Sequence, residues 1–170
     1  MKRVSVLLTV LVLAAGCSKT DTAPAADDNR AQFTANLLAA SEVPPIAGAE
    51  STAAGTAHID FNLTRNAAGA ITAATVHFRV DLTGFAASSA ITNAHIHTGA
   101  SGVVGGVLVA ASVAAGEVTL TGGVGTFSRL SLPLSAANAQ AIINNPAGFY
   151  FNVHSSANPG GVVRGQLVRQ

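Results

Sequence analysis

Apolar and polar residues alternate along two neighbouring segments, and this pattern limits the possible folds more than any other feature of the chain. In residues 55–63 the apolar positions are Ala57, Ile59, Phe61 and Leu63. In residues 71–82 they include Val76, Phe78, Val80 and Leu82. Side chains of a β-strand point alternately to opposite faces, so a period of two predicts strands with one buried face. The intervening sequence RNAAGA contains turn-forming asparagine and glycine, which predicts an antiparallel hairpin.

Shorter segments with strand-forming composition follow, and glycine-rich turns separate them. We predict further strands at 32–39, 89–97, 103–111, 117–121, 148–154 and 162–168. Residues 135–144 (SAANAQAIIN) are the one good helix candidate, because Ser135 is a favourable N-cap and Pro146 lies just past the end. The predicted fold class is therefore all-β, an antiparallel β-sandwich or barrel with one short helix near residues 135–144.

The N-terminus has the pattern of a secretory signal. Lys2 and Arg3 precede an apolar run that is too short to span a bilayer as a helix. Residues 13–17 (LAAGC) resemble the bacterial lipobox, and Cys17 is the only cysteine of the chain. This resemblance implies cleavage before Cys17, acylation of its sulfur and a stable lipid anchor in the membrane. The alternative is a plain signal peptide followed by a stray cysteine.

The chain divides into three parts. Residues 1–16 form the signal peptide, and residues 17–30 hold the lipidated cysteine and a small, polar, flexible tether. Residues 31–170 are long enough for one well-buried domain. No aspartate follows the lipidated cysteine, which by resemblance to known sorting rules implies the outer membrane, on its periplasmic or its surface-exposed side. Removal of the signal lowers the formal net charge from +1 to −1, which argues against a nucleic-acid partner.

Two histidines end one of the predicted strands. His95 and His97 share one face of the segment NAHIH, while Ala94 and Ile96 share the other. Side chains two residues apart on a strand are separated by about 6–7 Å at their bases. Both imidazoles can therefore turn toward one ion.

A third histidine lies at the end of the predicted strand 148–154. His154 shares its face with Asn152 and lies beside the loop that follows the strand. If this strand neighbours NAHIH, three imidazoles can meet around copper or zinc, and Asn152 would support them by a hydrogen bond. The alternative is a hydrogen-bonded trio that shapes the loops without a metal ion, because H-x-H alone is a weak signal.

The remaining two histidines lie in the predicted hairpin. If Thr64 pairs with Ile71, His58 and His77 become direct cross-strand neighbours, with Cβ atoms about 4.5–5.5 Å apart. They would then form an accessory pair. A shift of register by one residue breaks this match, and the alternative is two exposed strand residues.

Five segments together resemble one known family. They are LAASEVPP at 38–45, GTA at 55–57, AHIHTG at 94–99, GVVGGV at 102–107 and YFNVHSSANPGGVVRGQL at 150–167. These motifs are similar to those of the CHRD domain, a family named from chordin and common in bacterial secreted proteins. The resemblance implies a β-rich extracytoplasmic domain, and no defined reaction comes with it.

The last of these motifs adds two further residues to the candidate site. Arg164 and Gln166 lie on the same face of the final strand, and the planar fork of Arg164 can hold a carboxylate or a loop backbone. The family usually has a glutamate after the two glycines, where this chain has Val162. If that carboxylate pairs with the arginine or completes a metal shell, this protein lacks it.

Three functions are compatible with these residues. We predict an envelope-anchored, non-enzymatic binding module with a copper or zinc site on His95, His97 and His154. One alternative is a metalloenzyme, because H-x-H on a β-scaffold resembles copper–zinc superoxide dismutases. The other is a structural or partner-binding module without metal. Nucleophile-elbow and Walker motifs are missing from the sequence. Apart from the membrane at Cys17, the partner stays open.

Overall fold

The two alternating segments form the long hairpin that the sequence predicts, in a computed structural model that describes residues 28–170. Strand β2 (Ala54–Arg65) pairs antiparallel with β3 (Ile71–Thr83). The apolar positions of both strands are buried and belong to the hydrophobic core. The burial of one face, predicted from the period of two in the sequence, is therefore confirmed.

The register of this hairpin differs from the predicted one. Arg65, and not Thr64, lies opposite Ile71, and the register shifts between Thr64 and Arg65. The reason lies in the turn, where the side chain of Asn66 accepts hydrogen bonds from the backbone of Ala68 and Ala70, each at 3.0 Å. The tighter turn shifts the ladder, and the predicted pairing of Thr64 with Ile71 is wrong.

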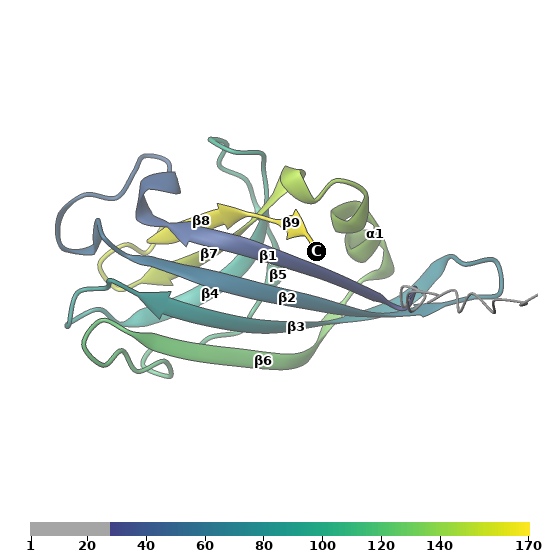
Figure 1. Cartoon of the computed structure of the whole chain (residues 1–170), viewed down its shortest axis with the longest axis horizontal. Helices are drawn as coiled ribbons and strands as arrows, with labels where there is room; N and C mark the ends of the chain where they lie inside the picture. Colours follow the sequence, from purple (N-terminus) through teal and green to yellow (C-terminus); the bar gives the residue numbers. More distant parts are fainter. Residues whose placement is uncertain (1–27) are drawn as a thin grey trace, which may run out of the picture.

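The other strands extend this hairpin into one antiparallel sheet. They are β1 (Arg30–Leu38), β4 (Ile91–Thr98), β5 (Val107–Ala110), β6 (Gly125–Leu134), β7 (Phe149–Ser155), β8 (Val163–Gln166) and β9 (Val168–Arg169). Their order is β5-β4-β7-β8-β1-β2-β3-β6, and β9 pairs with β1 beside this path. The sheet curls into a nearly closed barrel (Figure 1). The predicted all-β class is confirmed, in its barrel form.

The edge strands β5 and β6 come together where the barrel closes. The guanidinium of Arg129 on β6 donates to the carbonyl of Ser112, just after β5, at 3.4 Å from both Nε and Nη2. Its Nη2 also lies 2.6 Å from Oε1 of Glu117. This arginine therefore links the two edges that the ladder itself leaves open.

The predicted helix is present at one end of the barrel (Figure 1). Helix α1 (Ala136–Asn144) begins after Ser135, whose hydroxyl accepts a hydrogen bond of 3.1 Å from the backbone of Asn138. Three short 3-10 helices cover Ala39–Ser41, Gly48–Glu50 and Pro146–Gly148. In the described part of the chain, no helix is both long and apolar enough to cross a membrane.

Two strand predictions are wrong. Residues 117–120 form a turn, a bend and irregular backbone, and only an isolated bridge between Thr121 and Val124 remains. Strand β6 was not predicted, because it contains Pro133 and Ser131, which has a φ of 56°, and because these break the alternation. Both features are tolerated at a sheet edge, where no second neighbour requires a regular ladder.

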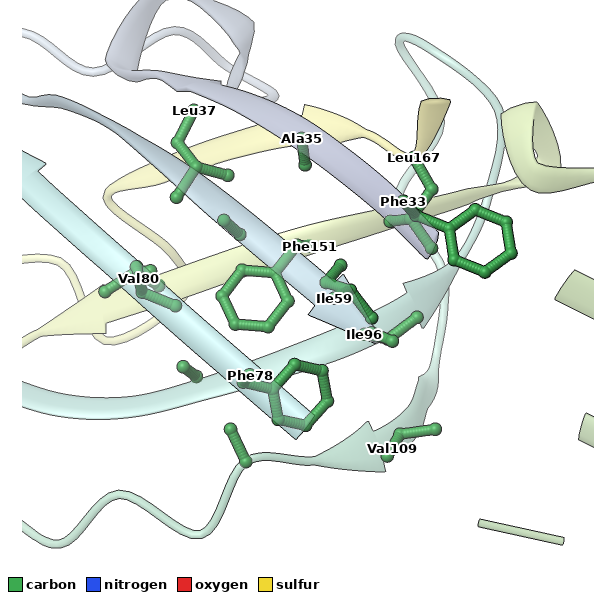
Figure 2. Close-up of a cluster of buried hydrophobic side chains, with 14 of the residues drawn as sticks. Phe33, Ala35, Leu37, Ile59, Phe78, Val80, Ile96, Val109, Phe151 and Leu167 are labelled. Atoms are coloured by element: carbon green, nitrogen blue, oxygen red, sulfur yellow. The ribbon is translucent and has the colours of Figure 1, made fainter. Parts of the chain in front are cut away.

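The core fills the interior of the barrel with side chains from opposite walls (Figure 2). Phe78 on β3 and Phe151 on β7 meet with ring centroids 5.4 Å apart and a tilt of 50°. Phe33 and Phe61 make a similar pair at 5.1 Å. Both faces of strand β7 are buried. Its second face lies outside the barrel wall and forms the floor of the candidate site.

We predict that Phe151→Ala lowers the free energy of unfolding by about 3–5 kcal/mol, because it leaves a cavity beside Phe78. Urea denaturation measures the loss. The matched control is Leu130→Ala on β6, where the side chain is 72% exposed and the expected change is within about 0.5 kcal/mol. Equal losses in the two variants would contradict the assignment of Phe151 to the core.

Candidate metal centre

Strands β4 and β7 lie side by side, as the metal-site hypothesis requires. His97 is opposite Tyr150, His95 is opposite Asn152, and Asn93 is opposite His154. Paired residues of an antiparallel ladder project from the same face, so all three histidines rise from the outer face of the barrel. Ala94 and Ile96, on the other face of β4, are fully buried in the core.

The three imidazoles form one cluster. One ligand nitrogen from each of His95, His97 and His154 lies within 4.8 Å of the others. Nδ1 of His95 is 3.0 Å from Nε2 of His154. Nitrogens that share a zinc ion at about 2.1 Å are at most about 4.2 Å apart, so a small rotation of the rings brings them into a common shell. The predicted convergence of the three histidines is confirmed.

Backbone carbonyls fix the tautomers of two rings. Nδ1 of His97 is 3.0 Å from the carbonyl oxygen of Gly105, and Nδ1 of His154 is 2.9 Å from that of Pro159. A carbonyl oxygen can only accept, so each Nδ1 carries the proton and each Nε2 is unprotonated. Imidazoles that bind metal ions are typically held in this way. Nε2 of His154 accepts a hydrogen bond from Nδ1–H of His95 at 3.0 Å, a bond that a metal ion on this nitrogen would replace.

The approach of the Gly105 carbonyl requires a glycine at that position. A Cβ on Gly105 would lie 1.6 Å from the carbonyl oxygen of Thr98, which no side chain can tolerate. The loop 99–106 therefore presses closely onto the end of β4. This contact brings the acceptor to His97.

Burial favours the neutral form of two rings of the cluster, His95 and His154. Burial and, to a smaller extent, repulsion from protonated His154 and His97 together lower the pKa of His95 to about 4. Burial also lowers the pKa of His154, against the hydrogen bond to Pro159, which raises it. Metal ions bind the neutral form of imidazole, so the lowered pKa values of His95 and His154 favour the binding form of these two rings.

An aromatic ring supports the cluster from the side. Tyr150 stacks on His97 with centroids 5.0 Å apart and an interplanar angle of 10°. The guanidinium carbon of Arg164 lies 4.8 Å from the centroid of the Tyr150 ring. The Tyr150 hydroxyl accepts a hydrogen bond of 3.3 Å from the backbone of Gly105. Tyr150 is therefore held by the same residue that orients His97.

Arg164 holds two loops over this face of the barrel. Its Nε donates to the carbonyl of Ser41 at 2.6 Å, and one terminal nitrogen donates to that of Val103 at 3.2 Å. The predicted role of Arg164 as a holder of loop backbone agrees with these bonds. Gln166 does the same further along β8, donating to the carbonyls of Gly99, Ala147 and Phe149.

The carboxylate beside Arg164 comes from a residue that sequence reasoning missed. Oε2 of Glu42 lies 3.7 Å from Nε of Arg164, and both side chains are buried. Val162, where the family usually has glutamate, is buried in the hydrophobic core. The carboxylate that pairs with Arg164 is therefore that of Glu42. Glu42 lies in the motif LAASEVPP, and its place in a family motif was the only sequence signal that could have marked it as a candidate site residue.

Asn152 belongs to the surroundings of Glu42 more than to those of the histidines. A Cβ on Gly161 would lie 2.6 Å from Nδ2 of Asn152 and 2.7 Å from Oε1 of Glu42, so both groups crowd the same glycine. In the described part of the chain, Oδ1 of Asn152 and Oε1 of Glu42 have no hydrogen-bond partner. The expected hydrogen bond from Asn152 to a histidine is not formed; Pro159 and Gly105 take that role.

The predicted accessory pair is separated. His58 lies opposite Arg79, and His77 lies opposite Asp60. His58 lines a cavity of about 290 Å³ beside β1, whereas Nε2 of His77 contacts Asn62 at 3.2 Å. The expectation of a direct pair is wrong, because it rested on the incorrect hairpin register. The predicted lipidation site, Cys17, falls outside the described residues.

Fold and site together define a class of protein: an antiparallel β-barrel domain with an all-histidine cluster on its outer wall. The family model of the CHRD domain matches residues 33–167. The chain therefore belongs to the CHRD domain family, which confirms the resemblance of its motifs. Neither the curated proteins nor the solved structures include a significant match to this chain.

We predict that Glu42→Gln stabilises the protein more at pH 8 than at pH 5. Burial raises the pKa of Glu42 to about 7, although Arg164 and a backbone hydrogen bond oppose this shift. Between the unfolded pKa, near 4.5, and about 7, the native state binds one proton more than the unfolded state. Stability therefore falls as the pH rises through this window, by up to about 1.4 kcal/mol per pH unit.

Urea denaturation of both proteins at the two pH values measures the effect. Taking the difference between wild type and variant cancels the titration of the histidines, which both proteins share. We expect that difference to grow by on the order of 2 kcal/mol from pH 5 to pH 8 in favour of the variant. A difference that is the same at both pH values would show that Glu42 ionises freely.

Proposed function

We propose that this domain is a non-enzymatic binding module of the bacterial cell envelope that holds one copper or zinc ion on His95, His97 and His154. The observation that supports the proposal is the clustering of three imidazoles, with one ligand nitrogen from each within 4.8 Å of the others and two of their tautomers set by carbonyl oxygens. Imidazole suits both copper and zinc, so these three ligands are compatible with either ion.

The alternative, a purely structural hydrogen-bonded trio, accounts less well for His97. Within residues 28–170, Nε2 of His97 is buried and has no hydrogen-bond partner. A buried acceptor in that state costs about 1–3 kcal/mol. A structural trio would satisfy all its nitrogens, whereas a metal ion uses this lone pair. The lone pair of His97 therefore favours a metal site.

The arrangement suits capture of an ion. His97 and His154 are each 8% exposed, while His95 is only partly buried, so the cluster opens to solvent on the side of His95. An ion can enter there, and water can complete the shell that the three imidazoles begin.

We predict that the purified full chain binds one equivalent of Cu²⁺ or Zn²⁺ and that His97→Ala weakens binding by more than about 100-fold. Tyr150 is the only tyrosine and the chain has no tryptophan, so its fluorescence reports on the ring that stacks on His97. We expect Cu²⁺ to quench this fluorescence, and Zn²⁺ to compete with Cu²⁺ for the site.

His77→Ala is the matched control, because it removes a histidine outside the cluster and should leave affinity unchanged. Equal weakening by both substitutions would indicate adventitious binding and refute the metal site. Superoxide dismutation by the copper-loaded wild type, lost in His97→Ala, would replace binding with catalysis as the function.

We further propose that Cys17 carries a lipid anchor that attaches the domain to the outer membrane. The lipobox-like sequence before Cys17 supports this. In the bacterial envelope, we expect the wild type to incorporate labelled palmitate and to sediment with membranes. Cys17→Ser should lose the label and appear in the soluble fraction. Retention of the label in Cys17→Ser would contradict the anchor at this residue.

A further inference from the structure

A second buried carboxylate lies close to the histidine cluster in space and far from it in sequence. Glu50, at the end of the 3-10 helix Gly48–Glu50, is 3% exposed. Its carboxylate accepts hydrogen bonds from the hydroxyls of Ser89 and Ser155 and, at 2.6 Å, from Nδ2 of Asn158. Burial raises the pKa of Glu50, but these three donors outweigh it and hold the pKa below its usual value. Glu50 is therefore an ionised acceptor with a full set of donors.

The donors of Glu50 define the turn that follows β7. The carbonyl of Asn158 accepts from the backbone of Ser155 at 3.3 Å and from that of Gly161 at 3.1 Å. The backbone of Asn158 donates in turn to the hydroxyl of Ser155 at 3.0 Å. Glu50 thus binds both ends of this local network, Ser155 and Asn158, through one oxygen.

The residue after Asn158 orients a histidine of the cluster. Pro159 supplies the carbonyl oxygen, 2.9 Å from Nδ1 of His154. The ring of proline fixes φ of Pro159, so the position of its carbonyl carbon follows the placement of Asn158, and only ψ of Pro159 is left to turn the oxygen. A displacement of Asn158 is therefore passed to the hydrogen bond that keeps the proton on Nδ1 of His154.

We propose that Glu50 is a positioning residue of the metal site, which holds His154 in the Nδ1–H tautomer through Asn158 and Pro159. This inference rests on the proposed function, because it assigns Glu50 a role toward the same ion. Glu50 touches none of the three histidines in any described contact, and it acts only through the turn 155–161. Metal binding at this site therefore depends on a carboxylate contributed by the segment before β2.

The structure contains an internal control for this role. His97 is held by Gly105, in a loop that Arg164 anchors through Val103, and no described contact of this loop involves Glu50. Loss of the Glu50 network should therefore change the ring of His154 and leave the ring of His97 unaltered. A merely structural role would lower stability without separating the two histidines.

The test is the ¹⁵N NMR spectrum of the histidine rings in the full chain in detergent micelles, free of metal, for wild type and Glu50→Gln. In the wild type we expect His97 and His154 to show the Nδ1–H tautomer. In Glu50→Gln, His154 should become a mixture of tautomers while His97 keeps its shifts. Asn158→Ala should give the same result and serves where Glu50→Gln does not fold. Asp81→Asn, which removes an exposed carboxylate on β3, is the matched control.

A second readout is Zn²⁺ affinity, which we expect Glu50→Gln and Asn158→Ala to lower by about 10–100-fold, the usual effect of losing support behind a metal ligand. Unchanged His154 shifts in the folded variants would overturn the proposal, as would a parallel change in His97. If the tautomer of His154 responds but the wild type binds no metal, the positioning by Glu50 stands and the proposed metal function fails. The two results are therefore distinguishable.

Discussion

The antiparallel pairing of β4 with β7 is the interaction on which the rest of this structure depends. It places Ile96 and Phe151 on one face of the barrel wall, where both are fully buried in the core. By the geometry of the ladder, it places His95, His97 and His154 together on the other face. A shift of this pairing by one residue would expose the core and scatter the imidazoles at once. Core packing therefore enforces the geometry of the site.

A buried polar face outside the core is costly unless its groups find partners. Here the partners are mostly backbone carbonyls of the covering loops: Gly105 and Pro159 accept from the histidines, and Ser41 and Val103 accept from Arg164. Each of these bonds fixes a loop and a side chain together. The loops and the candidate site are thus one structure, which explains why a distant residue such as Glu50 can act on His154.

Much of this arrangement was predictable from the sequence, and the failures have physical causes. Alternation identified the faces of β2 and β4 and put His154 on a polar face at a strand end. That its strand neighbours NAHIH was a condition of the prediction, which the pairing of β4 with β7 fulfils. The hairpin register was missed because the Asn66 side chain reorganises the turn. Glu42 and Glu50 were missed because their partners lie more than 100 residues away, at Arg164 and Ser155. Periodicity in the sequence predicts which face of a strand is buried. It carries no information on contacts between loops that are distant in the sequence.

The central claim is that the three histidines bind one ion together, and X-ray absorption by the metal-loaded full chain tests it most directly. The account predicts a first shell dominated by nitrogen at about 2.0–2.1 Å, with outer-shell scattering from three imidazole rings, and the loss of one ring in His154→Ala. A shell dominated by oxygen, or a spectrum that His154→Ala leaves unchanged, would contradict it.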